Sequence, residues 1–309
     1  MTWWKRRMGI VALATGLTLV AGPLSAQTLG DFRPSWSPDG KKIAFQSTRD
    51  GNDELYVLDL ASGEVTRLTD HIASDAQPSW SPDGVWIVFA SDRSRDSFSG
   101  RAAYQLYLMR SDGTGVRRLA ETTSADFMPR WSPDGEWIAF LSDRDRELGI
   151  FVMRPDGSDV HSLLPPEFEA TPGNPSWSPD GRRVAFDAAN GESYDIYSVG
   201  LDSGDVVNHT QSEESEWYPV WGPRKDWILA GVLTGTREDG THQIVALNAS
   251  GGQRSPVTAA TPRSGHARDW WPTWSPDGDR IAFASRRTGP WRLYVINADG
   301  SGEVALPAR

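Results

Sequence analysis

The stretch Pro34-Ser35-Trp36-Ser37-Pro38-Asp39-Gly40 decides the fold, because it returns almost unchanged along the whole chain. Four further copies occupy residues 78–84, 129–135, 175–181 and 272–278, and a degraded copy covers residues 219–223. The tryptophans of these six copies are 44 to 53 residues apart. Six copies of one motif at a nearly constant spacing indicate a repeat protein in which each copy forms one structural unit.

Each copy is followed by the same order of apolar runs and turn residues. After the Asp-Gly pair comes an apolar run such as 43–45, then a polar loop and a second run such as 55–57. A Gly turn and a last short run such as 65–68 complete the repeat, and the Gly residues supply the positive φ angles that hairpins need. Four antiparallel strands in about 45 residues are typical of one propeller blade. We therefore predict an all-β, six-bladed β-propeller with four antiparallel strands per blade.

The predicted propeller covers residues 27–309. Its blades are expected at about residues 31–70, 75–120, 126–165, 172–210, 216–258 and 269–306. Each repeat begins with its inner strand and ends with its outer strand, so each blade is expected to form from one contiguous repeat. Ring closure is then expected to depend on packing between the first and last blades, without a shared strand.

Residues 1–26 have the pattern of a secretory signal peptide. Lys5, Arg6 and Arg7 precede an apolar run over residues 10–21, and small residues follow up to Ala26. The apolar run is short for a membrane span. We predict cleavage after Ala26 and a periplasmic or otherwise secreted bacterial protein, with a retained N-terminal anchor as the alternative. We expect no membrane span in the mature chain.

Composition agrees with a turn-rich β protein and excludes several other classes. The 309 residues include 30 Gly, 21 Pro and 15 Trp, which fits neither a helical nor a disordered protein. The chain has no Cys, which excludes disulfides, thiolate metal sites and a cysteine nucleophile. The 41 acidic residues outnumber the 31 basic ones, so we expect no nucleic-acid partner.

The string Trp-Ser-Pro-Asp-Gly-x-x-Ile-Ala-Phe, followed by Ser-x-Arg and Leu-Tyr-Val, resembles the WD-repeat-like propeller repeat of the TolB family. The resemblance covers about residues 31–306 and extends to the propeller domains of tricorn-type and prolyl-oligopeptidase-type peptidases. Only residues 27–30 lie between the expected cleavage site and the first blade, so we expect a propeller without the α/β domain that precedes it in TolB. The sequence contains no Gly-x-Ser-x-Gly elbow, so we expect no peptidase of this kind.

Acidic residues recur five positions before the repeat tryptophan, at the predicted start of the inner strand. They are Asp31, Asp75, Asp126, Glu216 and Asp269. Propeller symmetry places them as a broken ring around the upper mouth of the channel. One interpretation is a site for a cation or a basic peptide, with Ca²⁺ as the metal best suited to oxygen ligands. The other is neutralisation within the fold by arginines that recur after the second strand, namely Arg49, Arg93, Arg144 and Arg287.

Aromatic residues and a histidine are expected around the same mouth, where the repeats diverge. They are Trp217, Tyr218, His266, Trp270 and Trp271. Together with the carboxylates they form the predicted partner site, which suits a protein or peptide and, as a second candidate, a carbohydrate. The alternative is that these loops are ordinary solvated surface.

We therefore expect a monomeric, non-catalytic binding or scaffold protein that presents its top face to a protein or peptide. The alternative hypothesis is a metal-assisted lyase or hydrolase that acts on a carbohydrate polymer at the channel mouth. A distant resemblance to propeller-type oligogalacturonate lyases, which rely on a histidine metal cluster, implies this second function. The five histidines include no His-x-His pair, so the motif pattern does not itself indicate a metal. Convergence of three or more upper histidines and acids would favour the enzyme.

Overall fold

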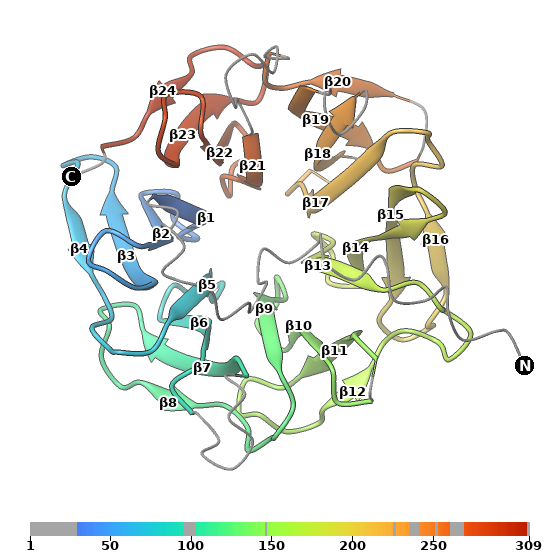
Figure 1. Ribbon diagram of the computed structural model, residues 1–309, viewed down its shortest axis with the longest axis horizontal. Helices are drawn as coiled ribbons and strands as arrows, with labels where there is room; N and C mark the ends of the chain where they lie inside the picture. The colour runs from blue at the N-terminus through green and yellow to red at the C-terminus, as the bar shows by residue number, and fades with distance from the viewer. Residues whose placement is uncertain are drawn as a thin grey trace, which may run out of the picture.

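The chain forms a ring of six sheets around a central axis (Figure 1). The computed structural model describes residues 30–94, 103–145, 147–224, 227–234, 241–250, 253–259 and 269–307. The predicted signal peptide lies outside these ranges. Within them the chain has twenty-four strands in six four-stranded antiparallel sheets. The predicted six-bladed, all-β propeller is therefore confirmed.

In every blade the strands follow one another in chain order from the axis outward (Figure 1). The first blade contains β1 (Asp31–Trp36), β2 (Lys42–Ser47), β3 (Glu54–Asp59) and β4 (Val65–Arg67). The second contains β5 (Asp75–Trp80), β6 (Trp86–Ser91), β7 (Gln105–Arg110) and β8 (Arg117–Arg118). The third contains β9 (Asp126–Trp131), β10 (Ile138–Ser142), β11 (Gly149–Met153) and β12 (His161–Ser162).

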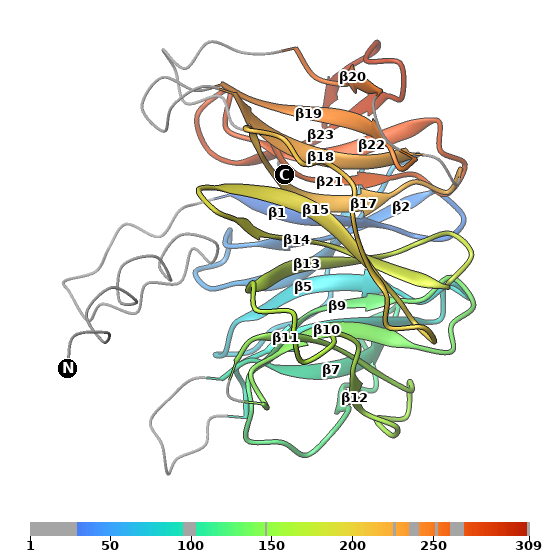
Figure 2. The same cartoon turned by 90° about the vertical axis from the view of Figure 1, so that its right-hand side faces the viewer.

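The remaining three blades have the same order. The fourth contains β13 (Pro172–Trp177), β14 (Arg183–Asn190), β15 (Ser193–Gly200) and β16 (Val206–Asn208). The fifth contains β17 (Ser215–Trp221), β18 (Trp227–Thr234), β19 (Thr241–Asn248) and β20 (Arg254–Pro256). The sixth contains β21 (Asp269–Trp274), β22 (Arg280–Ser285), β23 (Arg292–Asn297) and β24 (Val304–Ala305). Figure 2 shows the strands running between the two faces of the ring.

The Pro-Asp-Gly segments form the turns between the inner and second strands. In the first blade the Ser37 hydroxyl donates to Asp39 Oδ1 at 2.6 Å, and the Lys42 N–H donates to Ser37 Oγ at 2.9 Å. Gly40 follows with φ of 68°, a conformation that glycine adopts without steric cost. We call the face that carries these turns the lower face, and the face on which the inner strands begin the upper face.

The core lies between blades, because the second strands are buried on both faces. Phe45, Phe89 and Phe140 on these strands are at most 2 % exposed. The repeat tryptophans pack against the preceding blade: Trp80 joins a cluster with Ala44 of the first blade. The repeat tryptophans therefore pack as wedges between blades, and such buried aromatic side chains contribute a large apolar area.

The first and sixth blades close the ring by packing. Phe32 and Trp36 of the first blade share an apolar cluster with Trp291 of the sixth. A single parallel bridge joins Gly30 to Trp291, and the Asp31 N–H donates to the Trp291 carbonyl at 3.1 Å. The bridge was not predicted, but each described sheet is built from consecutive strands. No helix that could cross a membrane occurs in the described ranges.

Candidate functional site

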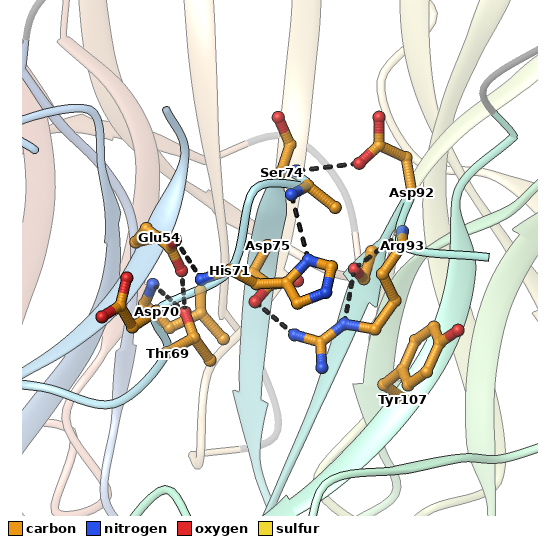
Figure 3. Close-up of polar contacts among 12 residues, drawn as sticks. Glu54, Thr69, Asp70, His71, Ser74, Asp75, Asp92, Arg93 and Tyr107 are labelled. Atoms are coloured by element: carbon orange, nitrogen blue, oxygen red, sulfur yellow. Dashed lines mark hydrogen bonds and ion pairs between the residues drawn. The ribbon is translucent and has the colours of Figure 1, made fainter. Parts of the chain in front are cut away.

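The predicted ring of carboxylates is present on the upper side, and every member is paired with an arginine. The pairs are Asp31 with Arg49, Asp75 with Arg93, Asp126 with Arg144, Asp269 with Arg287 and Glu216 with Arg254, at N–O distances of 2.5 to 2.9 Å. All five carboxylate residues are at most 7 % exposed. Figure 3 shows the Arg93 guanidinium turned toward Asp75.

The Ser-x-Arg motif positions these arginines. In the third blade Ser142 Oγ accepts the Arg144 backbone N–H at 3.3 Å and the Arg144 Nε–H at 2.9 Å. The guanidinium also lies 5.1 Å from the ring centre of Phe140 and 5.0 Å from that of Phe151. Burial raises the pKa of Asp126 although Arg144 opposes the shift. These contacts favour the interpretation that the ring is neutralised within the fold.

A second polar network fixes the connection between the first two blades (Figure 3). The buried Glu54 carboxylate accepts from the Thr69 hydroxyl at 2.5 Å and from the His71 backbone N–H at 2.7 Å. The imidazole Nδ1 of His71 accepts the Ala73 N–H at 3.0 Å, and Asp92 accepts the Ser74 N–H at 2.8 Å. The His71 ring therefore stabilises a turn between the two blades.

The other described histidines also have structural contacts. His209 Nδ1 lies 2.9 Å from the Ala249 carbonyl, and burial lowers the pKa of its imidazole. The His242 ring stacks on Trp217 at 6.1 Å. His266, a predicted site residue, lies outside the described residues. Among the residues that the structure describes, no group of three or more His, Asp or Glu side chains is arranged to hold a metal.

The inner strands carry a feature that sequence reasoning missed. Each is interrupted by a register shift in its pairing with the second strand. At each shift one non-glycine residue has φ between 40° and 60°; these are Arg33, Gln77, Met128, Asn174, Tyr218 and Trp271. Positive φ is uncommon for such residues and marks a strained, specifically held position. The six side chains differ completely although their neighbours repeat.

Four of these six residues line one cavity on the axis. The cavity has a volume of about 200 Å³, and its lining includes Arg33, Asn174, Tyr218 and Trp271. Arg130, from the end of β9, completes it. The signal for Arg130 was present in the sequence, because it replaces the serine that precedes the tryptophan in three other copies. The predicted site lies instead at the upper rim, where the repeated acids stand.

The predicted aromatic residues form a cluster beside this cavity, between the fifth, sixth and first blades. Trp270 lies 5.4 Å from Trp271, and Trp271 lies 5.8 Å from Tyr218 and 5.3 Å from Trp291, measured between ring centres. Tyr218, Trp270 and Trp271 are partly exposed. Trp217 reaches the cluster only through His242, whose ring stacks on Trp217 at 6.1 Å and lies 5.8 Å from that of Trp270. The structure thus brings together three of the four predicted aromatic residues, which we call the aromatic cluster.

Asp187 on β14 is a buried acid that the sequence did not reveal. Its Oδ1 accepts from the Asn174 side chain at 2.8 Å and from the Tyr218 N–H at 3.2 Å. Burial raises the pKa of Asp187 to about 6. Gly173 makes room for it, because a Cβ at that position would lie 2.6 Å from Asp187 Oδ2. Asp187 therefore holds two residues of the cavity in place.

Comparison with known families and sequences shows that parts of the chain are similar to TolB. A family model described as the TolB beta propeller domain matches residues 10–98. An uncharacterised protein of Agrobacterium fabrum is 33% identical over 149 residues, which cover 46% of this chain and 48% of that protein. The Tol-Pal system protein TolB of Bordetella pertussis is 38% identical over 128 residues, or 41% of this chain and 28% of TolB. The matched segments thus span about half or less of these relatives.

Solved structures show the same fold at low sequence identity. A structure from Agrobacterium tumefaciens assigned to TolB superposes with a TM-score of 0.67 at 20% identity, covering 81% of this chain and 86% of that one. An oligogalacturonate lyase in complex with manganese gives a TM-score of 0.57 at 15% identity, covering 91% and 90% of the two chains. At these identities the similarity concerns the fold alone.

Proposed function

We propose that this chain, a TolB-like β-propeller, is an exported, non-catalytic scaffold that binds a protein or peptide. The proposed contact region is the aromatic cluster with the adjoining axial cavity. The N-terminal signal pattern supports export to the periplasm.

The observation that carries this proposal is the contrast between repeated and variable positions. The turns, the second strands and the acid–arginine pairs repeat and have contacts that stabilise the fold. The inner-strand positions at positive φ carry six different side chains, and four of them gather at one cavity beside the aromatic cluster. Partly exposed tryptophan and tyrosine are the residues that most often anchor protein interfaces. A rigid ring that presents such residues needs little ordering on binding, which favours affinity.

Site-specific photo-crosslinking tests the proposal. The variant Tyr218→p-benzoylphenylalanine places a crosslinker in the aromatic cluster, and Val85→p-benzoylphenylalanine places it at an exposed turn on the lower face as a control. We expect the first variant, expressed with its export signal, to trap one protein that the second does not trap. That protein, once purified, should bind the wild-type propeller and lose about tenfold or more in affinity to Tyr218→Ala.

Equal crosslinking at both positions, or unchanged affinity for Tyr218→Ala, would contradict the proposal. Trapping of a carbohydrate polymer without any protein would favour the other partner class instead.

A further inference from the structure

We propose that the axial cavity is an anion site in which Arg33 of the first blade and Arg130 of the third bind a carboxylate group of the partner. The inference rests on the proposed function only in assigning that carboxylate to a peptide, as its C-terminus or an acidic side chain.

The lining of the cavity has the chemistry of an anion site. It contains the two guanidinium groups and the hydroxyls of Ser35, Ser79 and Ser176. Among the described residues that line it, none is acidic, although the whole chain has 41 Asp and Glu against 31 Lys and Arg. A neighbouring cavity of about 220 Å³ shares Arg130 and Ser176, and its described lining is likewise free of acids. Positive charge therefore gathers on the axis of an acidic protein.

The two arginines differ from the repeated ones in their partners. Arg49, Arg93 and Arg144 each meet a carboxylate of their own blade. Within the described part of the chain, neither Arg33 nor Arg130 has an ion pair. The Arg33 guanidinium lies 5.0 Å from the ring centre of Trp271, and Arg130 Nη1 donates to the Pro129 carbonyl at 3.2 Å. Most donors of both groups remain available to a ligand.

The surroundings make an incoming anion favourable. Burial lowers the pKa of Arg33 and lowers that of Arg130 to about 10, and the positive charge of Arg33 adds to the effect on Arg130. Two cations thus repel each other in a space with little water. Asp53 and Asp187 attract Arg33 only from a distance. Asp53 already accepts a hydrogen bond from the Gln46 side chain at 2.7 Å, and Asp187 is held by hydrogen bonds from the fourth and fifth blades. A bound anion would relieve both the repulsion and the desolvation cost.

The serines add neutral donors. Ser35 Oγ accepts the Trp80 N–H at 3.3 Å, Ser79 Oγ accepts the Trp131 N–H at 3.3 Å, and Ser176 Oγ accepts the Trp221 N–H at 3.0 Å. Each hydroxyl proton is left for another acceptor. A planar carboxylate accepts from two guanidinium groups and a hydroxyl at once, and such charge-assisted bonds are among the stronger ones in proteins.

The pair of arginines is not required by the repeat. The position of Arg130 is Ser35, Ser79, Ser176, Val220 or Thr273 in the other copies, and that of Arg33 is likewise different in each. An unpaired, poorly hydrated cation destabilises a fold. Two of them on one axis, at positions where the repeat uses neutral residues, point to a ligand.

Titration with simple carboxylates tests the inference by isothermal calorimetry. The probes are trialanine with a free C-terminus, its C-terminal amide, galacturonate and inorganic phosphate. We expect saturable binding of free trialanine, loss of about tenfold or more for Arg33→Gln and for Arg130→Gln, and little binding of the amide. Arg224→Gln, which changes an arginine on the lower face, is the matched control and should bind like wild type.

Thermal unfolding of the variants separates a loss of binding from a loss of folding. Without ligand, Arg130→Gln should unfold at the same temperature as wild type or higher, because it removes a half-buried, unpaired charge. Absence of saturable binding by trialanine, equal binding by Arg130→Gln, or equal binding of the amide would each overturn the inference. Binding of phosphate or galacturonate without trialanine would overturn the peptide carboxylate as the occupant. Because crosslinking at Tyr218 needs no carboxylate, failure of the proposed function is distinguishable from failure of this site.

Discussion

The buried pair of Asp126 and Arg144 permits a quantitative test of why the carboxylate ring exists. Asp126 is 1 % exposed, and Arg144 Nη2 lies 3.0 Å from its Oδ1 and 2.9 Å from its Oδ2. The variant Arg144→Met removes the charge but keeps an apolar chain against Phe140 and Phe151. It leaves a buried carboxylate whose pKa burial already raises.

The size of the effect follows from burial. Removing one partner of a buried ion pair typically costs about 3–5 kcal/mol, because the other charge stays uncompensated. The pair of Arg224 and Asp279 is a suitable control, since these side chains are 71% and 66% exposed and lie 2.7 Å apart. Breaking such an exposed pair by Arg224→Met should cost less than about 1 kcal/mol.

Urea unfolding followed by tryptophan fluorescence at pH 7 measures both losses. The double variant Arg144→Met with Asp126→Asn should be more stable than Arg144→Met alone, because no buried charge remains. The deficit of Arg144→Met should also shrink as the pH falls and Asp126 takes up a proton. If Arg144→Met costs no more than Arg224→Met, or the same with and without Asp126, the reasoning about the ring is refuted.

Three further predictions concern single positions. Burial raises the pKa of Asp187 to about 6. Because this value lies above the unfolded pKa of about 3.9, the protonated carboxyl stabilises the fold at low pH. That stabilisation is complete below about pH 3.9 and is lost as the pH rises through 6. Urea unfolding should show wild type losing about 2 kcal/mol relative to Asp187→Asn between about pH 4 and pH 7, and a constant difference would refute this. Gly173→Ala should cost about 1–3 kcal/mol in thermal unfolding through its contact with Asp187, and much less in an Asp187→Ala background. Gly30→Ala would place Cβ 2.3 Å from Trp291 Cβ, so it should destabilise ring closure by about 1–3 kcal/mol more than Gly51→Ala, whose Cβ meets nothing within 4 Å.

The blades could be predicted from the sequence because most of the contacts that define them are repeated. The Ser37–Asp39 turn and the Asp31–Arg49 pair each recur at a fixed offset, and a recurring offset shows which residues meet. The partner of Glu216 could not be found in this way. It is Arg254 on β20, which replaces the arginine that follows the second strand in the other pairs.

The axial cavity could not be predicted because its geometry depends on backbone conformations without a sequence signature. Arg33 and Trp271 have φ of 50° and 53°, although neither residue type favours positive φ. The alternation of side chains in a regular strand would place these residues on the opposite face of the strand from the one they occupy. Only the pairing with the second strand, which shifts register at this point in all six blades, imposes the bulge.

The fourth blade shows how departures from the repeat act together. Where the other inner strands carry a side chain after their first residue, this blade has Gly173, and where the first blade has Gln46 on its second strand, it has Asp187. Asp187 depends on Gly173, because a Cβ at position 173 would lie 2.6 Å from Asp187 Oδ2. Their joint result is that Asp187 reaches Asn174 and the Tyr218 backbone and fixes two sides of the axial cavity. Burial of Asp187 costs stability at neutral pH, where its carboxyl ionises, and this cost is consistent with the proposed role of the cavity in binding a partner.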